Sequence, residues 1–579
     1  MLRAGQVSSI PPLIGPDGEW ATTASGKADL FRTSFSSKYG LPEPVPNEYS
    51  AIQGPAGQRM SGFLPVRARW AKAVLKGLRE NCGTGPDGVP AKILKRCWRP
   101  LSVPLGMLTR LVLSSGSWPS CWKIHWLFPL FKRGAKSKPA NYRGIHLTSN
   151  VSKVVERILA RFMLPFFEES GSYGNNQFAY HRNRGYRDAL AFNVFQWIWA
   201  LGSGRRVALY CSDVSAAFDR VNASRLVEKL QAHGVCDALL KVVRSWLDSR
   251  IAKVCVDGSF AEDLEIQNQV YQGTVLGPPL WNIYYSDARA AINATGFVET
   301  VFADDLNCWR TYPGVCGNAG LNRDSAACQA ALHRWGAANQ VFFEPDKESF
   351  HILDTISPDG EAFKMLGVLF DTRLSMYKAV SHFVAEGTWR LQALLRTKRF
   401  YSTAELVRLY KCHVLSYIEG ATPAIYHAAE ATLRHLDRLQ DTFLEGVGLT
   451  PKEALLEHNL GPLGTRRDIA MLGLLYKVAH GRAPPSLASL FEPFRGQLAR
   501  YGFSSDPRLH SKALHEPLQP GHPRMLHRSI YGLIPIFNRL PGIVVRARSV
   551  KGFQRSLQRL AKDAAATGSH EWSRIFRPG

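Results

Sequence analysis

The chain has 579 residues, of which 45% are hydrophobic and 21% charged. This is the composition of an ordinary folded protein, and the length leaves room for roughly two to four domains. The 72 Lys and Arg residues outnumber the 47 Asp and Glu residues, which gives a formal net charge of +25. Such an excess favours a polyanionic partner, most simply nucleic acid. The alternative is a basic surface that binds no polyanion.

The ten cysteines form no C-x-x-C pair. This argues against a zinc knuckle, a disulfide framework and a redox motif, and it favours reduced thiols in an intracellular protein. No run of about 18 apolar residues occurs, so no membrane span is expected. The polar, Pro- and Gly-containing start of the chain predicts no signal peptide.

In chain order, residues 1–66 come first; they are rich in Pro, Gly and Ser and indicate a linker or arm in which only Ala28 to Tyr39 is helical. Amphipathic spacing predicts a helix from Trp70 to Arg79, and Trp126 to Phe131 has the pattern of a strand. Thr148-Ser149-Asn150 is a good N-cap for a helix whose apolar residues share one face.

The middle of the chain alternates between predicted strands and helices. Val207 to Cys211 is a buried-strand pattern that ends at Asp213. Asn222 is expected to cap one helix and Asp237 the next. A loop rich in Gly and Pro, Gln272 to Pro279, precedes a further helix.

Two adjacent carboxylates, Asp304 and Asp305, follow the apolar run Val298 to Phe302 and predict a strand that ends in a tight turn. Neighbouring carboxylates repel each other unless a cation lies beside them, although a solvated turn is the simpler interpretation of the pair alone. Asp213 is a third carboxylate in the same kind of position. On adjacent antiparallel strands the three acids would share Mg²⁺ ions, which prefer oxygen ligands and can promote in-line phosphoryl transfer.

After the acidic turn, a helix is predicted from Asp324 to Asn339, and strands from Ser349 to Leu353 and from Phe363 to Phe370. From Asp371 to about Ala479 the pattern is almost wholly helical. Residues 500–579 hold 14 Lys and Arg against four Asp and Glu. This excess favours contact with template or target phosphates, and the alternative is a basic solvated tail.

Seven blocks of sequence, in this order, resemble the fingers and palm motifs of the reverse transcriptases of non-LTR (LINE-type) retrotransposons. They are Asn141-Tyr142-Arg143-Gly144-Ile145-His146-Leu147, Asn176-Gln177-Phe178-Ala179-Tyr180, Asp213-Val214-Ser215-Ala216-Ala217-Phe218-Asp219, Gln272-Gly273-Thr274-Val275-Leu276-Gly277-Pro278-Pro279-Leu280, Phe302-Ala303-Asp304-Asp305, Pro345-Asp346-Lys347, and Lys364-Met365-Leu366-Gly367-Val368-Leu369. The close resemblance spans about residues 110 to 372.

The resemblance implies an α+β right-hand polymerase with fingers, an antiparallel-sheet palm, a helical thumb and a helical C-terminal extension. The domains expected from it are a Pro/Gly-rich linker or arm (1–66), an N-terminal helical extension (67–111), reverse transcriptase fingers and palm (112–375), a helical thumb (376–480) and a basic C-terminal region (481–579). No endonuclease is recognisable in the sequence, so we expect the polymerase region alone.

The resemblance also implies a catalytic site. Asp213, Asp304 and Asp305 would be the catalytic acids and, with the Val214 carbonyl, would hold two Mg²⁺ ions, with Mn²⁺ as the alternative. Phe218 matches the aromatic residue that blocks a ribose 2′-hydroxyl and so selects deoxynucleotides.

Nucleotide-binding and primer-binding residues are implied in the same way. Lys132 and Arg143 match the fingers cations that receive the incoming triphosphate. Gln272-Gly273 would lie near the nascent base pair, and Lys347 would act as general acid to the leaving pyrophosphate. The Leu366-Gly367 turn would hold the primer strand.

The expected function is that of an RNA-directed DNA polymerase, a nucleotidyltransferase whose partners are an RNA template, a DNA primer or target, and dNTPs. Its expected location is intracellular, in the nucleus for an integrating element. Two alternatives stay open: a catalytically inactive nucleic-acid-binding relic of such an element, and an RNA-dependent RNA polymerase. The Ala303-Asp304-Asp305 turn and the bulky Phe218 count against the second.

Overall fold

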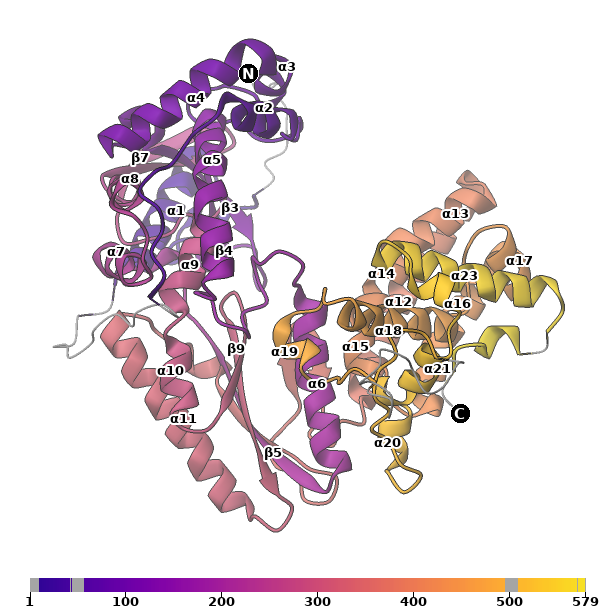
Figure 1. The fold of residues 1–579 in the computed structure, drawn as a ribbon. Coiled ribbons are helices and arrows are strands. Elements are labelled where there is room, and N and C mark those ends of the chain that lie inside the picture. The colour runs from indigo at the N-terminus through magenta and orange to yellow at the C-terminus, as the bar shows by residue number, and fades with distance from the viewer. Residues whose placement is uncertain (1–9, 42, 44–56, 495–508, 570, 578–579) are drawn as a thin grey trace. The chain divides into compact units, whose positions relative to one another are not determined.

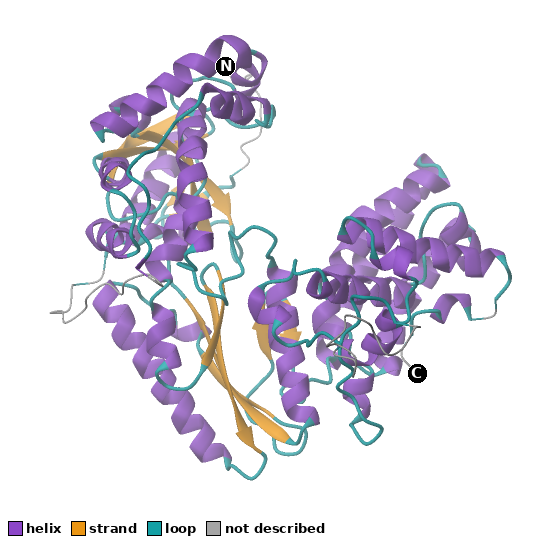
Figure 2. Cartoon of the chain, viewed as in Figure 1, coloured by secondary structure: helices purple, strands orange, loops and turns teal. Residues whose placement is uncertain are grey.

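The computed structural model describes residues 10–41, 43, 57–494, 509–569 and 571–577 (Figure 1). Helices predominate, and the strands of this part of the chain form two four-stranded and two two-stranded sheets (Figure 2). The fold class is therefore α+β, as predicted for a right-hand polymerase. The chain divides into two compact units. The first unit comprises Met1–Gly174, Asp213–Ala294 and Ala330–Asp346, and the second unit comprises Asn175–Ser212, Thr295–Gln329 and Lys347–Gly579.

The first unit is built on a four-stranded sheet with the order β4-β3-β6-β7. Its elements are β1 (Leu13–Ile14), β2 (Trp20–Ala21), α1 (Ala24–Tyr39), α2 (Ala68–Lys76), α3 (Ala91–Arg96), α4 (Trp98–Ser115), η2 (Ser120–Trp122), β3 (Ile124–Phe131), η3 (Pro139–Asn141), β4 (Tyr142–Leu147), α5 (Asn150–Glu169), η4 (Ala217–Asp219), α7 (Ala223–Ala232), α8 (Asp237–Leu247), β6 (Arg250–Val256), β7 (Ser259–Ile266), α9 (Gly277–Tyr285) and α10 (Ala288–Asn293). β3 is antiparallel to β4 and parallel to β6, which forms a hairpin with β7.

Helix α1 is the structured part of the predicted N-terminal arm, of which residues 1–9, 42 and 44–56 lie outside the described residues. It begins at Ala24 rather than Ala28, because the Thr23 hydroxyl caps its first turn. Phe31 and Phe35 are buried where α1 packs against β6 and β7. The helix is therefore part of the first unit and not a free arm.

Two predicted helix starts are confirmed by their cap geometry. The Ser149 hydroxyl accepts hydrogen bonds from the backbone N–H groups of Val151 and Ser152 (3.1 and 3.2 Å), and α5 follows. The Asn222 side-chain oxygen accepts a hydrogen bond from the Arg225 N–H (2.9 Å), and α7 follows. Such bonds satisfy N–H groups that have no partner within the helix.

Two other helix starts differ from the prediction. The prediction that Asp237 is an N-cap is wrong by one position, since α8 begins at Asp237 and Cys236 precedes it without a side-chain bond. α9 begins at Gly277, inside the predicted loop, because the Thr274 hydroxyl accepts a hydrogen bond from the Gly277 N–H (3.2 Å). The observed starts therefore differ from the predicted ones by only a few residues at most, which is usual for helix boundaries.

The second unit combines a second four-stranded sheet with most of the helices. Its elements are α6 (Tyr186–Gly202), β5 (Arg205–Asp213), β8 (Val298–Phe302), β9 (Asp305–Pro313), α11 (Asn318–Asn339), η5 (Pro345–Lys347), β10 (Ser349–Leu353), β11 (Phe363–Met365), β12 (Val368–Phe370), α12 (Tyr377–Arg396), η6 (Lys398–Phe400), α13 (Thr403–Tyr410), the π-helical turn η7 (Lys411–Leu415), α14 (Ser416–Gly420), α15 (Thr422–Ile425), α16 (Glu430–Val447), α17 (Pro451–Leu456), α18 (Leu463–Ala479), α19 (Pro485–Ala488), α20 (Arg524–His527), η9 (Ile530–Leu533), α21 (Ile534–Asn538), α22 (Gly542–Val545), α23 (Val550–Ala566) and η10 (Trp572–Arg574). Three of these elements extend across a boundary between the units. The last residue of β5, Asp213, belongs to the first unit, as do the part of α11 from Ala330 onward and the first two residues of η5.

The sheet of the second unit has the strand order β10-β5-β9-β8. β10 is antiparallel to β5, and β8 is antiparallel to β9. The predicted strand from Ser349 to Leu353 is β10, and the predicted strand from Phe363 to Phe370 is the hairpin of β11 and β12. Strands β5 and β8, which precede the acidic residues, are thus separated in this sheet only by β9.

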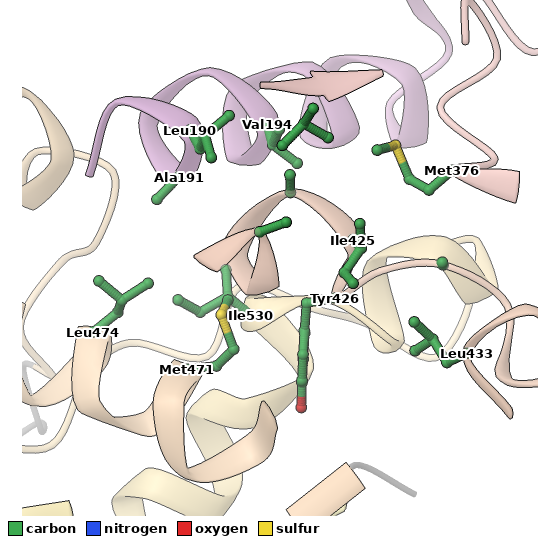
Figure 3. Close-up of a cluster of buried hydrophobic side chains, with 14 of the residues drawn as sticks. Leu190, Ala191, Val194, Met376, Ile425, Tyr426, Leu433, Met471, Leu474 and Ile530 are labelled. Carbon is green, nitrogen blue, oxygen red and sulfur yellow. The ribbon is translucent and has the colours of Figure 1, made fainter. Parts of the chain in front are cut away.

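The core of the second unit joins segments that are far apart in the sequence. Figure 3 shows Leu190 and Val194 of α6 in one cluster with Ile425, Met471 and Ile530. α6 is apolar on all sides and almost wholly buried, as expected of a helix that packs on several neighbours. The helical region predicted beyond Asp371 is confirmed, and its apolar faces close around α6. No helix among the described residues is long and apolar enough to cross a bilayer.

Buried Asn193 of α6 connects this helix to the sheet. Its side-chain oxygen accepts hydrogen bonds from the Thr300 hydroxyl (2.7 Å) and from the Trp309 indole N–H (3.1 Å), on β8 and β9. Its amide N–H lies 3.2 Å from the Met365 sulfur. A single buried amide thus fixes the β8–β9 hairpin against α6.

We predict that Asn193→Ala lowers the free energy of unfolding by about 2–5 kcal/mol, because two buried donors lose their acceptor. Urea denaturation followed by tryptophan fluorescence measures this change. Gln196→Ala, on the same helix but only partly buried, is the matched control and should change stability by less than about 0.5 kcal/mol. Equal effects of the two substitutions would contradict the assigned role of Asn193.

Candidate active site

The acidic pair lies at the tight turn that the sequence predicted. Phe302 and Asp305 face each other at the ends of β8 and β9, so Ala303 and Asp304 alone form the turn. Ala303 has φ +62°, in the left-handed region that the first central residue of such a hairpin turn adopts. The turn presents Asp304 and Asp305 at the end of the hairpin.

Gln177 holds this turn from the side. Its side-chain oxygen accepts hydrogen bonds from the N–H groups of Ala303 (3.3 Å) and Ala179 (2.9 Å). The backbone before and after Gln177 also bonds to Val301 of β8, through Asn176 and Phe178 (2.9 Å each). This role of Gln177 was not predicted, because no local signal in the sequence indicates a contact with a turn 126 residues away.

Asp213 is the last residue of β5, which lies beside β9 in the sheet. Its carbonyl accepts a hydrogen bond from the Glu344 N–H (3.1 Å), and the Ser215 N–H donates to the Phe342 carbonyl (2.8 Å). Neither of these two bonds uses the carbonyl of Val214. The predicted position of Asp213, at the end of a buried strand, is confirmed.

The end of β5 and the start of β9 are also connected electrostatically. Burial raises the pKa of the Cys211 thiol to about 12, and the charge of Asp305 contributes to the rise. Cys211 precedes Asp213 by two residues on β5. Asp305, the first residue of β9, therefore lies close to the C-terminal end of β5. In the sheet the neighbour of β5 is β9, which begins at Asp305, and not β8, which precedes Asp304.

Glu348 is an acid near the end of β5 that was not predicted as a site residue. Its carboxylate accepts hydrogen bonds from the Ser212 hydroxyl (3.2 Å) and the Gln329 amide (2.9 Å), and also from the Tyr210 hydroxyl. Burial and this carboxylate raise the pKa of Tyr210. Within the described part of the chain, no three His, Cys, Asp or Glu side chains are already grouped so as to hold a metal ion.

The predicted triphosphate cations lie on neighbouring strands of the first unit. Lys132 directly follows β3, and Arg143 is on β4; both are exposed. The Lys132 N–H donates to the Asn141 carbonyl (2.9 Å), which keeps the two strand ends together. Burial raises the pKa of Asp219 to about 6, and the charges of Lys38 and Arg143 oppose this rise. Asp219, Lys38 and Arg143 therefore form one cluster of charges.

Helix α1 supplies Lys38 to this cluster. The Lys38 ammonium donates to the carbonyls of Ala140 (3.0 Å) and Tyr142 (3.1 Å). Burial lowers the pKa of Lys38; Asp219 opposes the shift, and the nearby charge of Lys132 adds to it. Lys38 was not predicted as a site residue, because it lies in the expected linker, about a hundred residues before Ala140 and Tyr142, which it contacts.

Gln272 and Gly273 lie in a loop against β4. The Gln272 carbonyl accepts a hydrogen bond from the His146 N–H (2.9 Å), and its amide donates to Asp219 (3.3 Å). Gly273 has φ +102°, and a Cβ there would lie 2.7 Å from the His146 carbonyl oxygen. Only glycine fits this position without moving the backbone. The Phe218 ring stacks on Trp281, with the ring centres 6.0 Å apart.

A buried carboxylate, Glu156 of α5, clamps the same loop from the other side. Its side chain accepts hydrogen bonds from the N–H groups of Val275 (2.6 Å) and Leu276 (3.2 Å) and from the Trp246 indole (3.4 Å). Burial raises the pKa of Glu156, while these bonds and the charge of Arg250 oppose the rise. Glu156 was not predicted as a functional residue, since it lies on a helix in which the apolar pattern dominates.

Two buried histidines complete the polar layer beneath the loop. Their Nδ1 atoms, in His125 and His146, lie 3.0 Å apart, and the Arg250 guanidinium contacts the other nitrogen of His125. Burial and the Arg250 charge lower the pKa of His146 to about 3, and the same causes lower that of His125. Burial and the nearby Arg250 charge therefore favour the neutral form of both rings.

The remaining predicted site residues lie in the second unit. Leu366 and Gly367 form the two-residue turn between β11 and β12, both with positive φ (48° and 84°). Lys347 is the last residue of the short helix η5 and is partly buried. The structure gives their positions, and their roles stay predictions.

Comparisons with known proteins match the part of the chain that holds these residues. A family model described as reverse transcriptase (RNA-dependent DNA polymerase) matches residues 132–370. This range includes every residue predicted for the site, from Lys132 to Gly367.

Relatives with this description occur in insect mobile elements. The chain is 24% identical over 431 residues to the probable RNA-directed DNA polymerase from transposon X-element of Drosophila melanogaster, which covers 69% of this chain and 46% of the relative. It is 22% identical over 470 residues to the RNA-directed DNA polymerase from mobile element jockey of Drosophila funebris, covering 77% of this chain and 51% of the relative. The chain thus spans about half the length of these relatives. It contains a reverse transcriptase (RNA-dependent DNA polymerase) domain and is related to the polymerases of non-LTR retrotransposons.

Proposed function

We propose that the chain is an RNA-directed DNA polymerase that adds dNTPs to a primer 3′-hydroxyl on an RNA template and releases pyrophosphate. The observation that carries this proposal is the strand order of the second-unit sheet: β5, which ends in Asp213, neighbours β9, which begins with Asp305. Acids at such strand ends are suited to bind cations next to a reacting phosphate.

The donor set supports two Mg²⁺ ions as cofactors, with Mn²⁺ as the alternative. It consists of the carboxylates of Asp213, Asp304 and Asp305 and the carbonyl of Val214, without sulfur or imidazole ligands, and hard cations prefer such oxygen donors. When bound, the ions would stabilise the attacking and leaving oxygens of the phosphoryl transfer. Gln177 would keep the turn of Asp304 in the conformation that this requires.

The nucleotide would bind to residues of the first unit. Lys132 and Arg143, assisted by Lys38, would neutralise the triphosphate. The Phe218 ring, braced by Trp281, would exclude a 2′-hydroxyl, and Gln272-Gly273 would line the nascent base pair.

Further roles and boundaries belong to the same proposal. Lys347 would protonate the leaving pyrophosphate, and the Leu366-Gly367 turn would contact the primer. The fingers and palm would occupy residues 112–375, the thumb 376–480 and the basic extension 481–579. We expect a nuclear location, as suits an element that integrates into a genome.

Primer extension on a homopolymeric RNA template tests the function. We expect incorporation of dNTPs but not rNTPs, dependent on Mg²⁺ and abolished by EDTA. Asp304→Asn should reduce the rate at least about 100-fold, because an essential ligand is lost, with the melting temperature and template binding unchanged. Asp29→Asn, an exposed acid on α1, should have no effect. Use of rNTPs would support an RNA-dependent RNA polymerase, and template binding without extension would support an inactive relic.

The sugar preference should depend on Phe218. Phe218→Ala removes the ring that is proposed to meet the 2′-hydroxyl, so the preference for dNTPs over rNTPs, measured as a ratio of kcat/KM values, should fall by roughly 10–100-fold. Phe260→Ala removes an exposed ring of the same unit (44% exposed) and should leave the ratio unchanged. An unaltered ratio in the Phe218 variant, with folding intact, would rule out this role.

Lys38 should contribute to nucleotide affinity and not to the chemical step. We predict that Lys38→Gln raises the KM for dNTPs about 5–20-fold with kcat little changed, because one charge near the triphosphate is lost. Steady-state extension kinetics measure both values. Arg32→Gln is the control, since Arg32 lies on the same helix but pairs with Glu262 (3.5 Å). A change in kcat alone would argue against phosphate binding by Lys38.

A further inference from the structure

A trough with one apolar end and one basic end lies within the second unit, beside the N-terminal part of α6 and along α18 and α23. It consists of two adjoining pockets of about 360 Å³ and about 340 Å³. Both pockets are lined by Arg187, Ala470 and Gln554. We propose that this trough binds a single strand of nucleic acid, with a base in the apolar end and the phosphates along the basic end.

The apolar end has the size and lining that suit a nucleobase. It is lined by Tyr186, Pro423, Met471, Leu474 and Val550, and the Tyr186 ring is 38% exposed. Its volume lies within the range of pockets that bind small organic groups, and an exposed aromatic ring offers a stacking surface to any base.

Gln554 provides a polar group on the floor between the two ends. Its side chain lies directly on Gly473 of α18, where a Cβ would come within 2.6 Å of the amide nitrogen. The missing side chain at Gly473 therefore gives the amide room inside the trough. An amide both donates and accepts hydrogen bonds, as the edge of a base requires.

The basic end holds cations that no acid neutralises. Arg187, Lys551 and Arg555 are exposed and have no ion-pair partner among the residues that the structure describes. By contrast, the other cations of the trough are paired: Arg466 with Glu419 and Lys477 with Asp188, each at 2.5 Å.

Unpaired like charges that line the same pocket repel each other, and a phosphate backbone would relieve this repulsion. The combination of an apolar pocket for a ring and free guanidinium groups favours a nucleic-acid strand over an acidic peptide. The trough contains none of the residues proposed for catalysis, so the inference does not depend on polymerase activity.

Fluorescence anisotropy with the full chain and a labelled 12-nucleotide strand tests the proposal. Arg555→Gln should weaken binding about 3–5-fold and lower the slope of log affinity against log salt by about 1, because one phosphate contact is lost. Arg559→Gln, one turn further along α23, exposed and outside the trough lining, is the matched control and should change neither. Equal losses in the two variants would overturn the phosphate site.

The base site is tested with a strand that carries abasic positions. Tyr186→Ala should weaken binding of the normal strand about 5–10-fold but leave binding of the abasic strand unchanged. If both strands lose affinity equally, or if polyglutamate competes as well as the oligonucleotide, the proposal is wrong. The same measurement with an RNA strand and with a DNA strand of equal sequence identifies which nucleic acid the trough binds. Tighter RNA binding indicates the template, and tighter DNA binding indicates the target.

Extension from a preannealed primer separates this inference from the proposed function. The trough variants should extend such a primer at the wild-type rate, which also shows that they are folded. An inactive wild-type protein would refute the polymerase proposal while leaving the binding differences measurable.

Discussion

The conformation of the hairpin turn at Ala303 and Asp304 is the constraint on which the candidate active site depends. Adjacent carboxylates repel each other, so the backbone that carries them must be fixed from outside. The β8–β9 ladder aligns the two strands, Gln177 holds the N–H of Ala303, and Asn193 ties both strands to α6. The left-handed conformation of Ala303 is thus maintained by contacts from three separate segments.

The first unit uses a buried polar layer in the same way. Glu156 and the His146 N–H satisfy backbone groups of the loop that contains Gln272 and Gly273. Arg250 and His125 extend this polar layer through side-chain contacts. Burial disfavours the charged carboxylate, but two backbone N–H groups and an indole offset this cost. An apolar core could stabilise the unit equally well, but it could not bond to the N–H groups of Val275 and Leu276 and so define the path of the loop.

The second unit shows how distant segments create surfaces that no single segment carries. α6 precedes strands β5, β8, β9 and β10 in the chain, yet it is buried by helices that follow residue 371. Packing of α18 and α23 near the start of α6 produces the trough, which is lined by both paired and unpaired cations. Burial of apolar side chains drives the association of these helices, and the association positions the charged side chains that line the trough.

The sequence by itself determined the features that rest on local signals. The strand before the acidic pair, the tight turn, the caps Ser149 and Asn222 and the end of β5 at Asp213 were all predictable, because hydrophobic periodicity and capping act over a few residues. The motif order also identified the reverse transcriptase domain, which the family match at residues 132–370 confirms.

Only the tertiary structure revealed Gln177, Glu156, Lys38 and Glu348, and it alone decided the strand order β10-β5-β9-β8. Each of these side chains reaches a partner brought near by packing; Gln177, for example, contacts a turn 126 residues away. Such contacts leave no periodic signal in a single sequence, because they depend on how elements associate and not on what each segment prefers locally.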